Sequence, residues 1–181
     1  ELKALAAGAT PLDFAYAVHT DVGHHCVGAK VNGRIVPLSA TLRSGDIVEI
    51  LTSKTDRGPS RDWMGIVTTN RARNKIRAWF AREQREDTEQ KGRDLLQAAL
   101  RQNKLPTQRI ASSPVLAGVM REMGYRKAEE FYVALGAGNI TVPQVISKLL
   151  AHLKTEEVAE APTSARRVGG RSRALASESY G

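Results

Sequence analysis

The chain has 181 residues, a formal net charge of +8, a single cysteine and an apolar content of 41%. This length fits one large or two small domains, and one cysteine excludes an internal disulfide framework. No stretch approaches the roughly 20 apolar residues that a membrane-spanning helix needs, and no export signal is evident, so a cytoplasmic protein with no membrane partner is expected.

The positive charge is concentrated in the middle of the sequence. Residues 1–56 carry 5 Lys and Arg against 6 Asp and Glu, whereas residues 57–104 carry 12 against 6. Residues 105–155 carry 6 against 3. Because an excess of cations attracts polyanions, RNA is a candidate partner; a solvated helical face is the alternative explanation.

The first expected element is a short helix over residues 11–18. Thr10 is a favourable N-cap, Pro11 suits the first helical position, and Asp13 lies near the positive end of the helix dipole. The helical spacing is carried by Leu12, Ala15, Tyr16 and His19. The helix should end at a polar loop that starts at His19.

Two strands joined by a tight turn should follow. Asn32-Gly33 tolerates the positive φ angles of a type I′ turn, and residues 26–31 and 34–36 flank it as strands. Arg43 to Asp46 predicts a second turn, and the β-branched residues 47–51 predict a third strand. One helix with these strands indicates a small β-grasp binding module over residues 1–54.

A Gly/Pro-bearing connector at residues 55–60 is the expected domain boundary. From Thr68 onward the apolar period changes to 3.6, which predicts helices. Their apolar stripes begin at residues 72, 92, 115, 128 and 145 and should cover one another in a compact all-α domain over residues 61–154. Gly136 and Gly138 are expected to end one helix, and Thr141 to cap the next. Trp63, Trp79 and Tyr132 are expected in the core or at its margin.

Residues 155–181 consist mainly of Glu, Ala, Ser, Arg and Gly and contain almost no large apolar side chain. Such a segment cannot bury enough surface to offset its ordering entropy. The expected fold class is therefore α+β: a β-grasp module, an all-α helical domain and a disordered C-terminal tail.

The densest cluster of polar, donor-rich side chains in the first module is the segment HTDVGHHC, from His19 to Cys26. Imidazoles stack on bases and donate to phosphate or ribose, which favours recognition of an unpaired nucleic-acid end. A metal site is an alternative because imidazole and thiolate are good ligands, although a closed set of four at the usual spacing is missing. A Cys/His nucleophile is a further alternative, but no orienting partner is evident and the thiol is expected to face the core.

Two sets of cations are candidates for phosphate contacts. Lys30 and Arg34 flank the Asn32-Gly33 turn and are expected to project towards one face; their alternative role is to keep a sheet edge soluble. Five more cations flank the apolar stripe of the helix from about 70 to 85: Arg71, Lys75 and Arg82 on one side, Arg73 and Arg77 on the other. They suit contacts with a large RNA, the alternative being that their stems cover the margin of the stripe.

In order and spacing, residues 10–52 resemble a TGS domain, through ATPLDFAYAVHTDVGHHCVGAKVNGRIVPL and LRSGDIVEI. TGS-like sequences also occur in threonyl-tRNA synthetases and some GTPases. With PSRDWM and TTNRARNKIRAWF added, residues from about Leu5 to Leu153 resemble the regulatory region of a long Rel/SpoT-type (p)ppGpp synthetase/hydrolase. The resemblance implies a regulatory segment of a GTP pyrophosphokinase or (p)ppGpp pyrophosphohydrolase of the stringent response, without a catalytic site, metal or cofactor of its own.

The resemblance also implies partners and residue roles. The TGS domain would bind the CCA 3′ end of uncharged tRNA on the ribosome, with His19 as the contacting histidine and with Thr20, Asp21, His24, Lys30 and Arg34 as further site residues. The helical domain would contact ribosomal RNA, the tRNA or the N-terminal catalytic half of the protein through Arg71, Arg73, Lys75, Arg77 and Arg82. Acyl carrier protein, which some family members bind through the same TGS surface, is the alternative partner.

One departure from the family concerns the sheet. The family's TGS domain begins with a strand and a Thr-Pro-Lys-Gly turn before the segment that resembles residues 1–5, and the sequence has no counterpart of that strand. An incomplete sheet edge is therefore expected in the first module.

Overall fold

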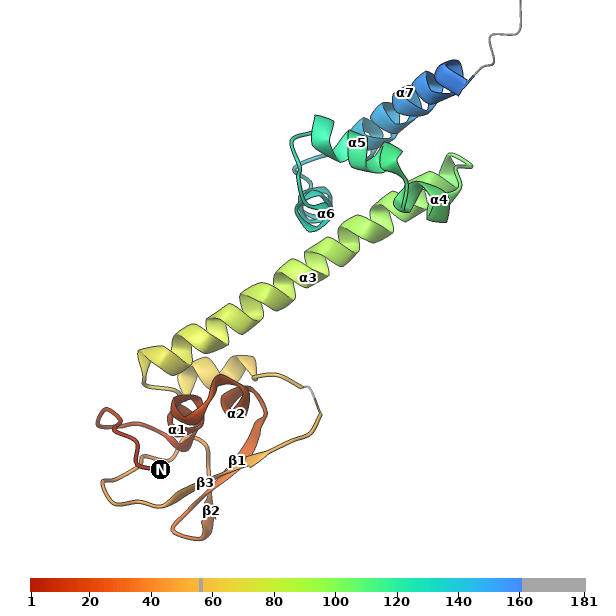
Figure 1. The fold of residues 1–181 in the computed structure, drawn as a ribbon. Coiled ribbons are helices and arrows are strands. Elements are labelled where there is room, and N and C mark those ends of the chain that lie inside the picture. Colours follow the sequence, from red (N-terminus) through yellow and green to blue (C-terminus); the bar gives the residue numbers. More distant parts are fainter. Residues whose placement is uncertain (56, 161–181) are drawn as a thin grey trace, which may run out of the picture.

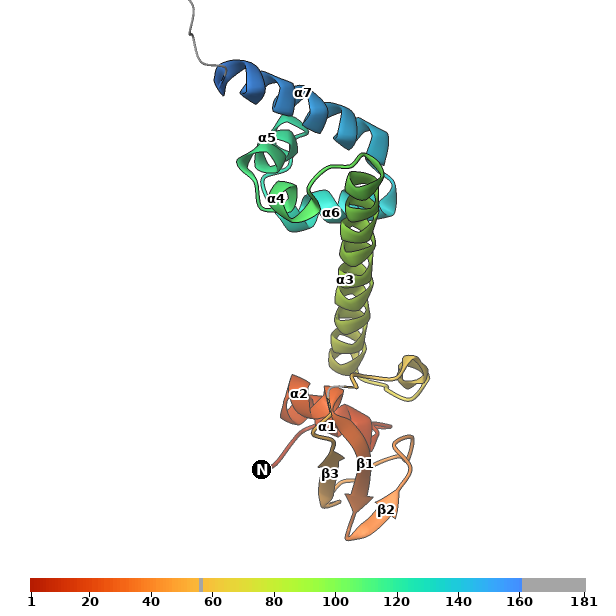
Figure 2. The same cartoon turned by 90° about the vertical axis from the view of Figure 1, so that its right-hand side faces the viewer.

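The computed structural model describes residues 1–55 and 57–160. A small module of helices and strands lies at one end, the long helix α3 leads away from it, and a group of helices lies at the other end (Figures 1 and 2). The elements, in chain order, are α1 (Pro11–Val18), α2 (Thr20–His24), β1 (Cys26–Val31), β2 (Arg34–Val36), β3 (Val48–Thr52), the 3-10 helix η1 (Arg61–Gly65), α3 (Asn70–Gln102), α4 (Thr107–Ala111), α5 (Pro114–Glu122), α6 (Ala128–Ala137) and α7 (Val142–Glu160). None of the helices in these ranges combines the length and apolar character that crossing a bilayer requires.

The predicted first helix is confirmed over the expected residues. Thr10 and Asp13 form a reciprocal capping box, and Pro11 occupies the first helical position. The prediction of a polar loop after α1 is wrong, because Thr20–His24 form the short helix α2. His19 is the N-cap of that helix, a role more often filled by Ser, Thr, Asp or Asn, and this explains why the sequence did not reveal it.

The three strands form an antiparallel sheet in the order β2-β1-β3. Asn32 (φ +50°) and Gly33 (φ +79°) make the expected tight turn between β1 and β2. The third strand begins one residue later than expected, since the Ile47 N–H donates to the Asn32 side chain instead of joining the ladder. In the part of the chain that the structure describes, β3 pairs with β1 alone, so its other edge is open.

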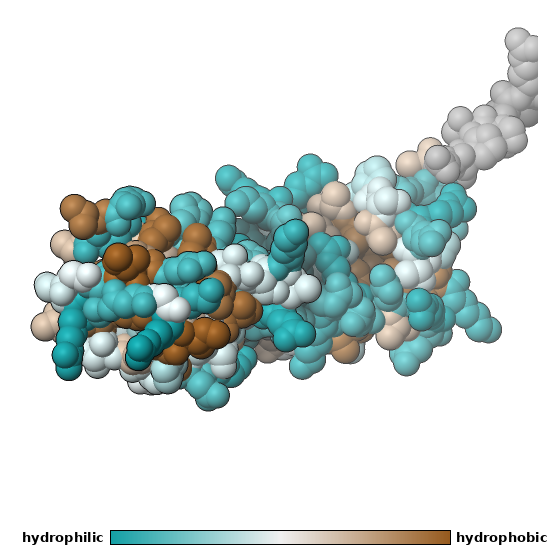
Figure 3. Space-filling view, turned by 90° about the horizontal axis from the view of Figure 1, so that it is seen from below, coloured by the Kyte–Doolittle hydropathy of each residue, from teal (hydrophilic) through white to brown (hydrophobic). Residues whose placement is uncertain are grey.

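The core of the N-terminal module includes residues from both sides of the 55–60 connector. Tyr16 of α1 and Cys26 of β1 pack with Val67 and with Ala72 and Ile76 of α3. The face of the molecule seen from below shows brown apolar groups among polar ones (Figure 3). In the strands and the turns next to them, Val27, Ile35 and Ile47 are 60%, 76% and 75% exposed.

Helix α3 is 33 residues long and belongs to two cores. Its first turns carry Ala72 and Ile76 in the N-terminal core, and its last turns carry Leu96 and Leu100 in the distal core. The expected compact packing of all five helical stripes is therefore wrong. The first two stripes lie on one continuous helix and face different neighbours.

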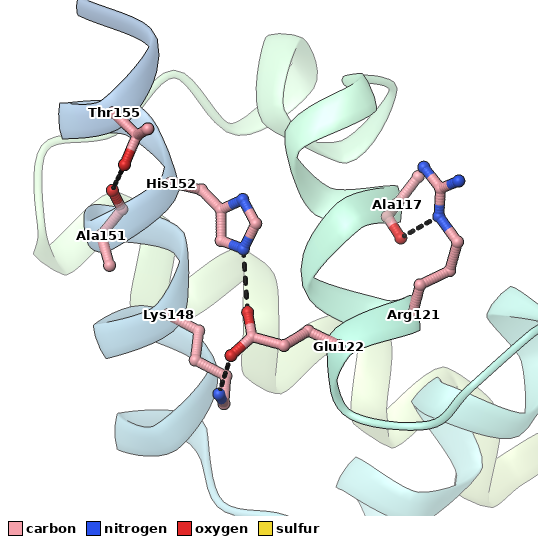
Figure 4. Close-up of polar contacts among 7 residues, drawn as sticks. All are labelled: Ala117, Arg121, Glu122, Lys148, Ala151, His152 and Thr155. Atoms are coloured by element: carbon pink, nitrogen blue, oxygen red, sulfur yellow. Dashed lines mark hydrogen bonds and ion pairs between the residues drawn. The ribbon is translucent and has the colours of Figure 1, made fainter. Parts of the chain in front are cut away.

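The distal core is formed by α3 to α7. The expected helices at Val115, Ala128 and Val145 are present, and α4 is an additional short helix. Gly138, with φ +83°, ends α6 as expected, whereas Gly136 lies inside the helix. Glu122 of α5 accepts hydrogen bonds from Lys148 and from His152 Nε2 (2.8 Å), which ties α5 to α7 (Figure 4).

The predicted disordered tail began at residue 155. Residues 155–160 are instead the last turns of α7. The remainder of the predicted tail, residues 161–181, lies outside the described residues.

Candidate nucleic-acid interface at His19

The imidazole of His19 is fixed at one nitrogen and open elsewhere. His19 has an extended backbone (φ −161°, ψ 149°), and its Nδ1 accepts the Asp21 backbone N–H at 3.1 Å. A backbone N–H can only donate, so Nδ1 is the acceptor and the neutral ring carries its proton on Nε2. The side chain is 66% exposed. A ring face for stacking and an Nε2–H donor are therefore both accessible to a ligand.

Two of the other expected residues lie beside His19. Asp21 is 74% exposed, and its Oδ2 lies 3.7 Å from His19 Nδ1. Thr20 lies between them in the first turn of α2 and is half-buried. The ring of His25, which was not among the expected contacts, donates from Nδ1 to the Asp21 carbonyl at 2.7 Å. His19 and Asp21 thus place an imidazole ring, its Nε2–H donor and a carboxylate acceptor next to one another.

His24 lies at the other end of α2 and packs inward. Its Nδ1 is 3.0 Å from the Tyr16 hydroxyl, and the two rings meet edge to face with centroids 5.3 Å apart. The ring of Trp79 in α3 lies 6.4 Å from it. Burial lowers the pKa of His24, and the positive charges of Arg82 and Lys75 act in the same direction, against the carboxylate of Asp21. The imidazole is therefore held in its neutral form between α1 and α3.

Lys30 and Arg34 do not share a face, contrary to expectation. Lys30 pairs with Ile35, and Arg34 pairs with Val31. Directly paired residues point to the same side of a sheet and successive residues to opposite sides, so the two cations point apart. Lys30 is also four residues along β1 from Cys26, about 13 Å at the rise of a strand.

The five expected cations of α3 lie in its first four turns. Arg71, Lys75 and Arg77 are exposed. Arg73 is half-buried and donates from Nη2 to the Val67 carbonyl at 3.4 Å, while Arg82 pairs with Glu86 at 3.6 Å. Arg82 is itself 72% exposed, so four of the five cations are accessible to a polyanion, and Arg73 and Arg82 also have contacts within the protein.

The alternative readings of the HTDVGHHC segment find little support in its geometry. The Cys26 thiol is 4% exposed and donates to the Gly28 carbonyl at 3.6 Å, and burial raises its pKa, which disfavours the thiolate that a nucleophile needs. Within residues 1–55 and 57–160, no three His, Cys, Asp or Glu side chains converge as a metal site would require.

Sequence reasoning missed the contact that joins the start of α1 to the start of α3. Asp13 was assigned only to the dipole of α1, yet its carboxylate also binds Thr68 and Thr69. The Thr68-Thr69-Asn70 pattern before an apolar period is itself a helix start, so the beginning of α3 could have been predicted from the sequence. The pairing across 55 residues of sequence had no local signal.

Comparison with known proteins places two domains on the chain. Residues 1–52 match the TGS domain, and residues 79–150 match the RelA/SpoT AH domain.

Relatives of known name extend this match over most of the chain. A GTP pyrophosphokinase of Streptomyces coelicolor is 50% identical over 160 residues, which is 88% of this chain and 19% of that protein. The bifunctional (p)ppGpp synthase/hydrolase RelA of Mycobacterium tuberculosis is 46% identical over 167 residues, 89% of this chain and 23% of that protein. A GTP pyrophosphokinase of Escherichia coli is 38% identical over 165 residues, 89% of this chain and 21% of that protein. The chain therefore spans about a fifth of the length of these relatives.

Proposed function

The chain belongs to the Rel/SpoT family through its TGS and RelA/SpoT AH domains, and we propose that it is a regulatory segment that senses the CCA 3′ end of uncharged tRNA on the ribosome. The observation that carries the proposal is the His19 side chain. It is 66% exposed, its orientation is fixed by the Asp21 N–H, and its Nε2–H is left as a donor.

The chemistry of a tRNA 3′ end matches these groups. The terminal adenine would stack on the imidazole, the Nε2–H would donate to a ribose or phosphate oxygen, and the Asp21 carboxylate would accept from a ribose hydroxyl. A terminal ribose packed against His19 would bring the esterified amino acid of an aminoacyl-tRNA up against the protein. Uncharged tRNA would then be preferred over aminoacyl-tRNA for steric reasons.

The helical part would extend the contact to larger RNA. The exposed cations Arg71, Lys75 and Arg77 are placed on a rigid helix, which suits contacts with the phosphates of ribosomal RNA or of the tRNA body. Binding would favour one arrangement of the whole cytoplasmic protein and so regulate a catalytic half that makes or hydrolyses (p)ppGpp. That regulation requires differential contacts in the two arrangements.

The test compares uncharged tRNA with aminoacyl-tRNA, using the parent chain, His19→Ala and the control His152→Ala. His152 lies in α7, so its variant makes the same substitution far from the site. A stacked base contributes about 1–3 kcal/mol, so His19→Ala should weaken binding of uncharged tRNA roughly 5- to 150-fold. Binding that is the same for both tRNA forms, or the same in the parent and His19→Ala, would refute the proposal.

A protein partner is the second candidate, and one observation favours it. Ile35 and Ile47 are 76% and 75% exposed, and exposed apolar side chains of this kind often mark protein contacts. Lys30 pairs with Ile35 and so lies on the same face of the sheet, where it would meet an acidic partner such as acyl carrier protein. Ile35→Ser should then abolish capture of acyl carrier protein and leave tRNA binding unchanged.

A further inference from the structure

One buried carboxylate lies where the N-termini of α1 and α3 meet. Asp13 is 1% exposed. Its Oδ2 accepts from the Thr10 N–H (2.9 Å), the Thr68 N–H (3.0 Å) and the Thr68 hydroxyl (3.0 Å). Its Oδ1 accepts from the Thr69 N–H (3.0 Å) and the Thr69 hydroxyl (2.7 Å). The same side chain therefore closes the capping box of α1 and binds the two residues that precede α3.

The charge of Asp13 suits this position. Burial alone raises the pKa of a carboxyl, but the hydrogen bonds from Thr10, Thr69 and Thr68 outweigh burial, and the pKa of Asp13 lies below its ordinary value. The positive ends of two helix dipoles also point towards the carboxylate. Asp13 is thus an ionised carboxylate that accepts hydrogen bonds at the N-termini of both α1 and α3.

A second contact joins the module to α3 further along the helix. His24, in the last turn of α2, lies between Tyr16 of α1 and Trp79 of α3. Gly23 makes this possible, because a Cβ there would lie 2.3 Å from the Tyr16 ring. Trp79 is ten residues beyond Thr69, about 15 Å along the helix.

Two separated contacts determine the direction of a rod, whereas one contact leaves it free to pivot. We propose that Asp13 and His24 are positioning residues that together fix the direction of α3 relative to the site at His19. The inference deepens the proposed function, on which its regulatory meaning rests. His19 begins α2 and His24 lies at its end, so a ligand that shifts His19 acts through one short helix on the His24 contact with α3.

The test measures the spread of one intramolecular distance in the chain. Spin labels are attached at Ser44→Cys and Gln97→Cys, both exposed, in a Cys26→Ala background. Pulsed electron paramagnetic resonance should give one narrow distance distribution for this parent. Asp13→Asn and His24→Ala should each at least double its width, while Glu122→Gln, in the distal α5–α7 contact, should leave it unchanged.

Milder variants keep the test decisive where a buried substitution unfolds the module. Thr68→Val removes the hydroxyl that donates to Asp13 and that also lies 3.4 Å from the Gly8 carbonyl, and Tyr16→Phe removes only the hydroxyl at His24; each should broaden the distribution by a smaller amount. An unchanged width in the folded members of both pairs overturns the inference. Binding of uncharged tRNA is measured in parallel: loss in His19→Ala, with retention within threefold in Glu122→Gln, supports the proposed function, and the broadened distance distributions support the inference. Retention in His19→Ala overturns the proposed function alone, because the distance measurement does not depend on tRNA.

Discussion

The crossing of α3 and α6 depends on two glycines, and replacing one of them should destabilise the distal core. A Cβ at Gly92 would lie 1.9 Å from the Tyr132 carbonyl oxygen, and a Cβ at Gly136 would lie 1.9 Å from the Thr88 carbonyl oxygen. A carbon and a carbonyl oxygen in close contact lie about 3.3–3.6 Å apart, so Gly92→Ala must separate the two backbones by more than about 1 Å. Backbone atoms of packed helices cannot yield as the end of a flexible side chain can.

The expected magnitude follows from two opposing effects. Alanine is favoured over glycine inside a helix by about 0.5–1 kcal/mol. Forcing extra volume into a packed site costs about 1–3 kcal/mol and occasionally more, and the upper end applies because the obstacle is backbone. Gly92→Ala should therefore lower the free energy of unfolding of the distal core by about 2–2.5 kcal/mol.

Gly118→Ala is the matched control. Gly118 lies inside α5, and a Cβ there would lie 3.6 Å from His152 Cε1, an ordinary van der Waals contact. The helix preference then acts alone, and this variant should be more stable by about 0.5–1 kcal/mol.

Urea unfolding followed by two probes separates the effects. Both tryptophans, Trp63 and Trp79, belong to the N-terminal core or its margin, so their emission reports on that end. Far-UV circular dichroism reports on all the helices. Gly92→Ala should lower the midpoint of the dichroism transition and leave the tryptophan transition in place. Equal effects of the two variants on the dichroism midpoint, or a midpoint that falls in Gly118→Ala and not in Gly92→Ala, would refute the reasoning.

Two further predictions concern the N-terminal module, and tryptophan emission measures both. The pKa of His24 is held below its usual value of about 6.5, so the unfolded chain takes up the proton first. The stabilisation by the neutral ring is complete above about pH 6.5 and declines as the pH falls below it. Burial lowers the pKa of His24; the charge of Asp21 raises it, and those of His25, Arg82 and Lys75 lower it further. The urea midpoint should therefore fall between pH 7 and pH 5, and His24→Gln should reduce this dependence; an unchanged slope would contradict the assignment. Asn32→Ala removes the acceptor of the Ile47 N–H (3.0 Å) at a residue with φ +50°, and should lower stability by about 1–2 kcal/mol, whereas Thr41→Ala, at an exposed residue before the second turn, should have little effect.

The parts of the fold that the sequence predicted correctly are those with local signals. Thr10, Pro11 and Asp13 define a helix start within four residues, and Asn32-Gly33 requires positive φ angles that few other pairs tolerate. The short helix α2 escaped because its N-cap is a histidine, whose ring accepts the N–H that a hydroxyl or carboxylate usually accepts. A local rule based on residue preference has no means to recognise such a substitute.

The parts that the sequence did not predict depend on contacts between distant residues. The apolar stripes at Ala72 and Gly92 were assigned to one compact domain, because periodicity shows that a stripe is covered but not by which neighbour. Gly136 was taken as a helix end for the same reason: a glycine required for close approach has the same appearance in sequence as one required for a positive φ. At the candidate site, the family resemblance implied that His19 contacts a ligand, whereas only the structure revealed that His24 packs against Tyr16 and Trp79.

The middle of α3 connects the two cores as an exposed stretch of helix. No described residue between Ile76 and Gly92 is fully buried. This stretch is supported by pairs four residues apart: Arg82–Glu86 at 3.6 Å, Glu89–Arg93 at 2.6 Å and Gln90–Asp94 at 2.9 Å.

Pairs of this kind contribute only about 0.2–0.5 kcal/mol each, and a solvated helix of this length is marginal by itself. The helix persists because both of its ends are nucleated inside packed cores. Weakening the contacts of Asp13 and His24 with α3 should therefore also weaken one of the two packed ends that keep the exposed middle of α3 helical. If Asp13 and His24 fix the direction of α3 as proposed, a change at that anchor also alters the helicity of the exposed span that leads to the distal core.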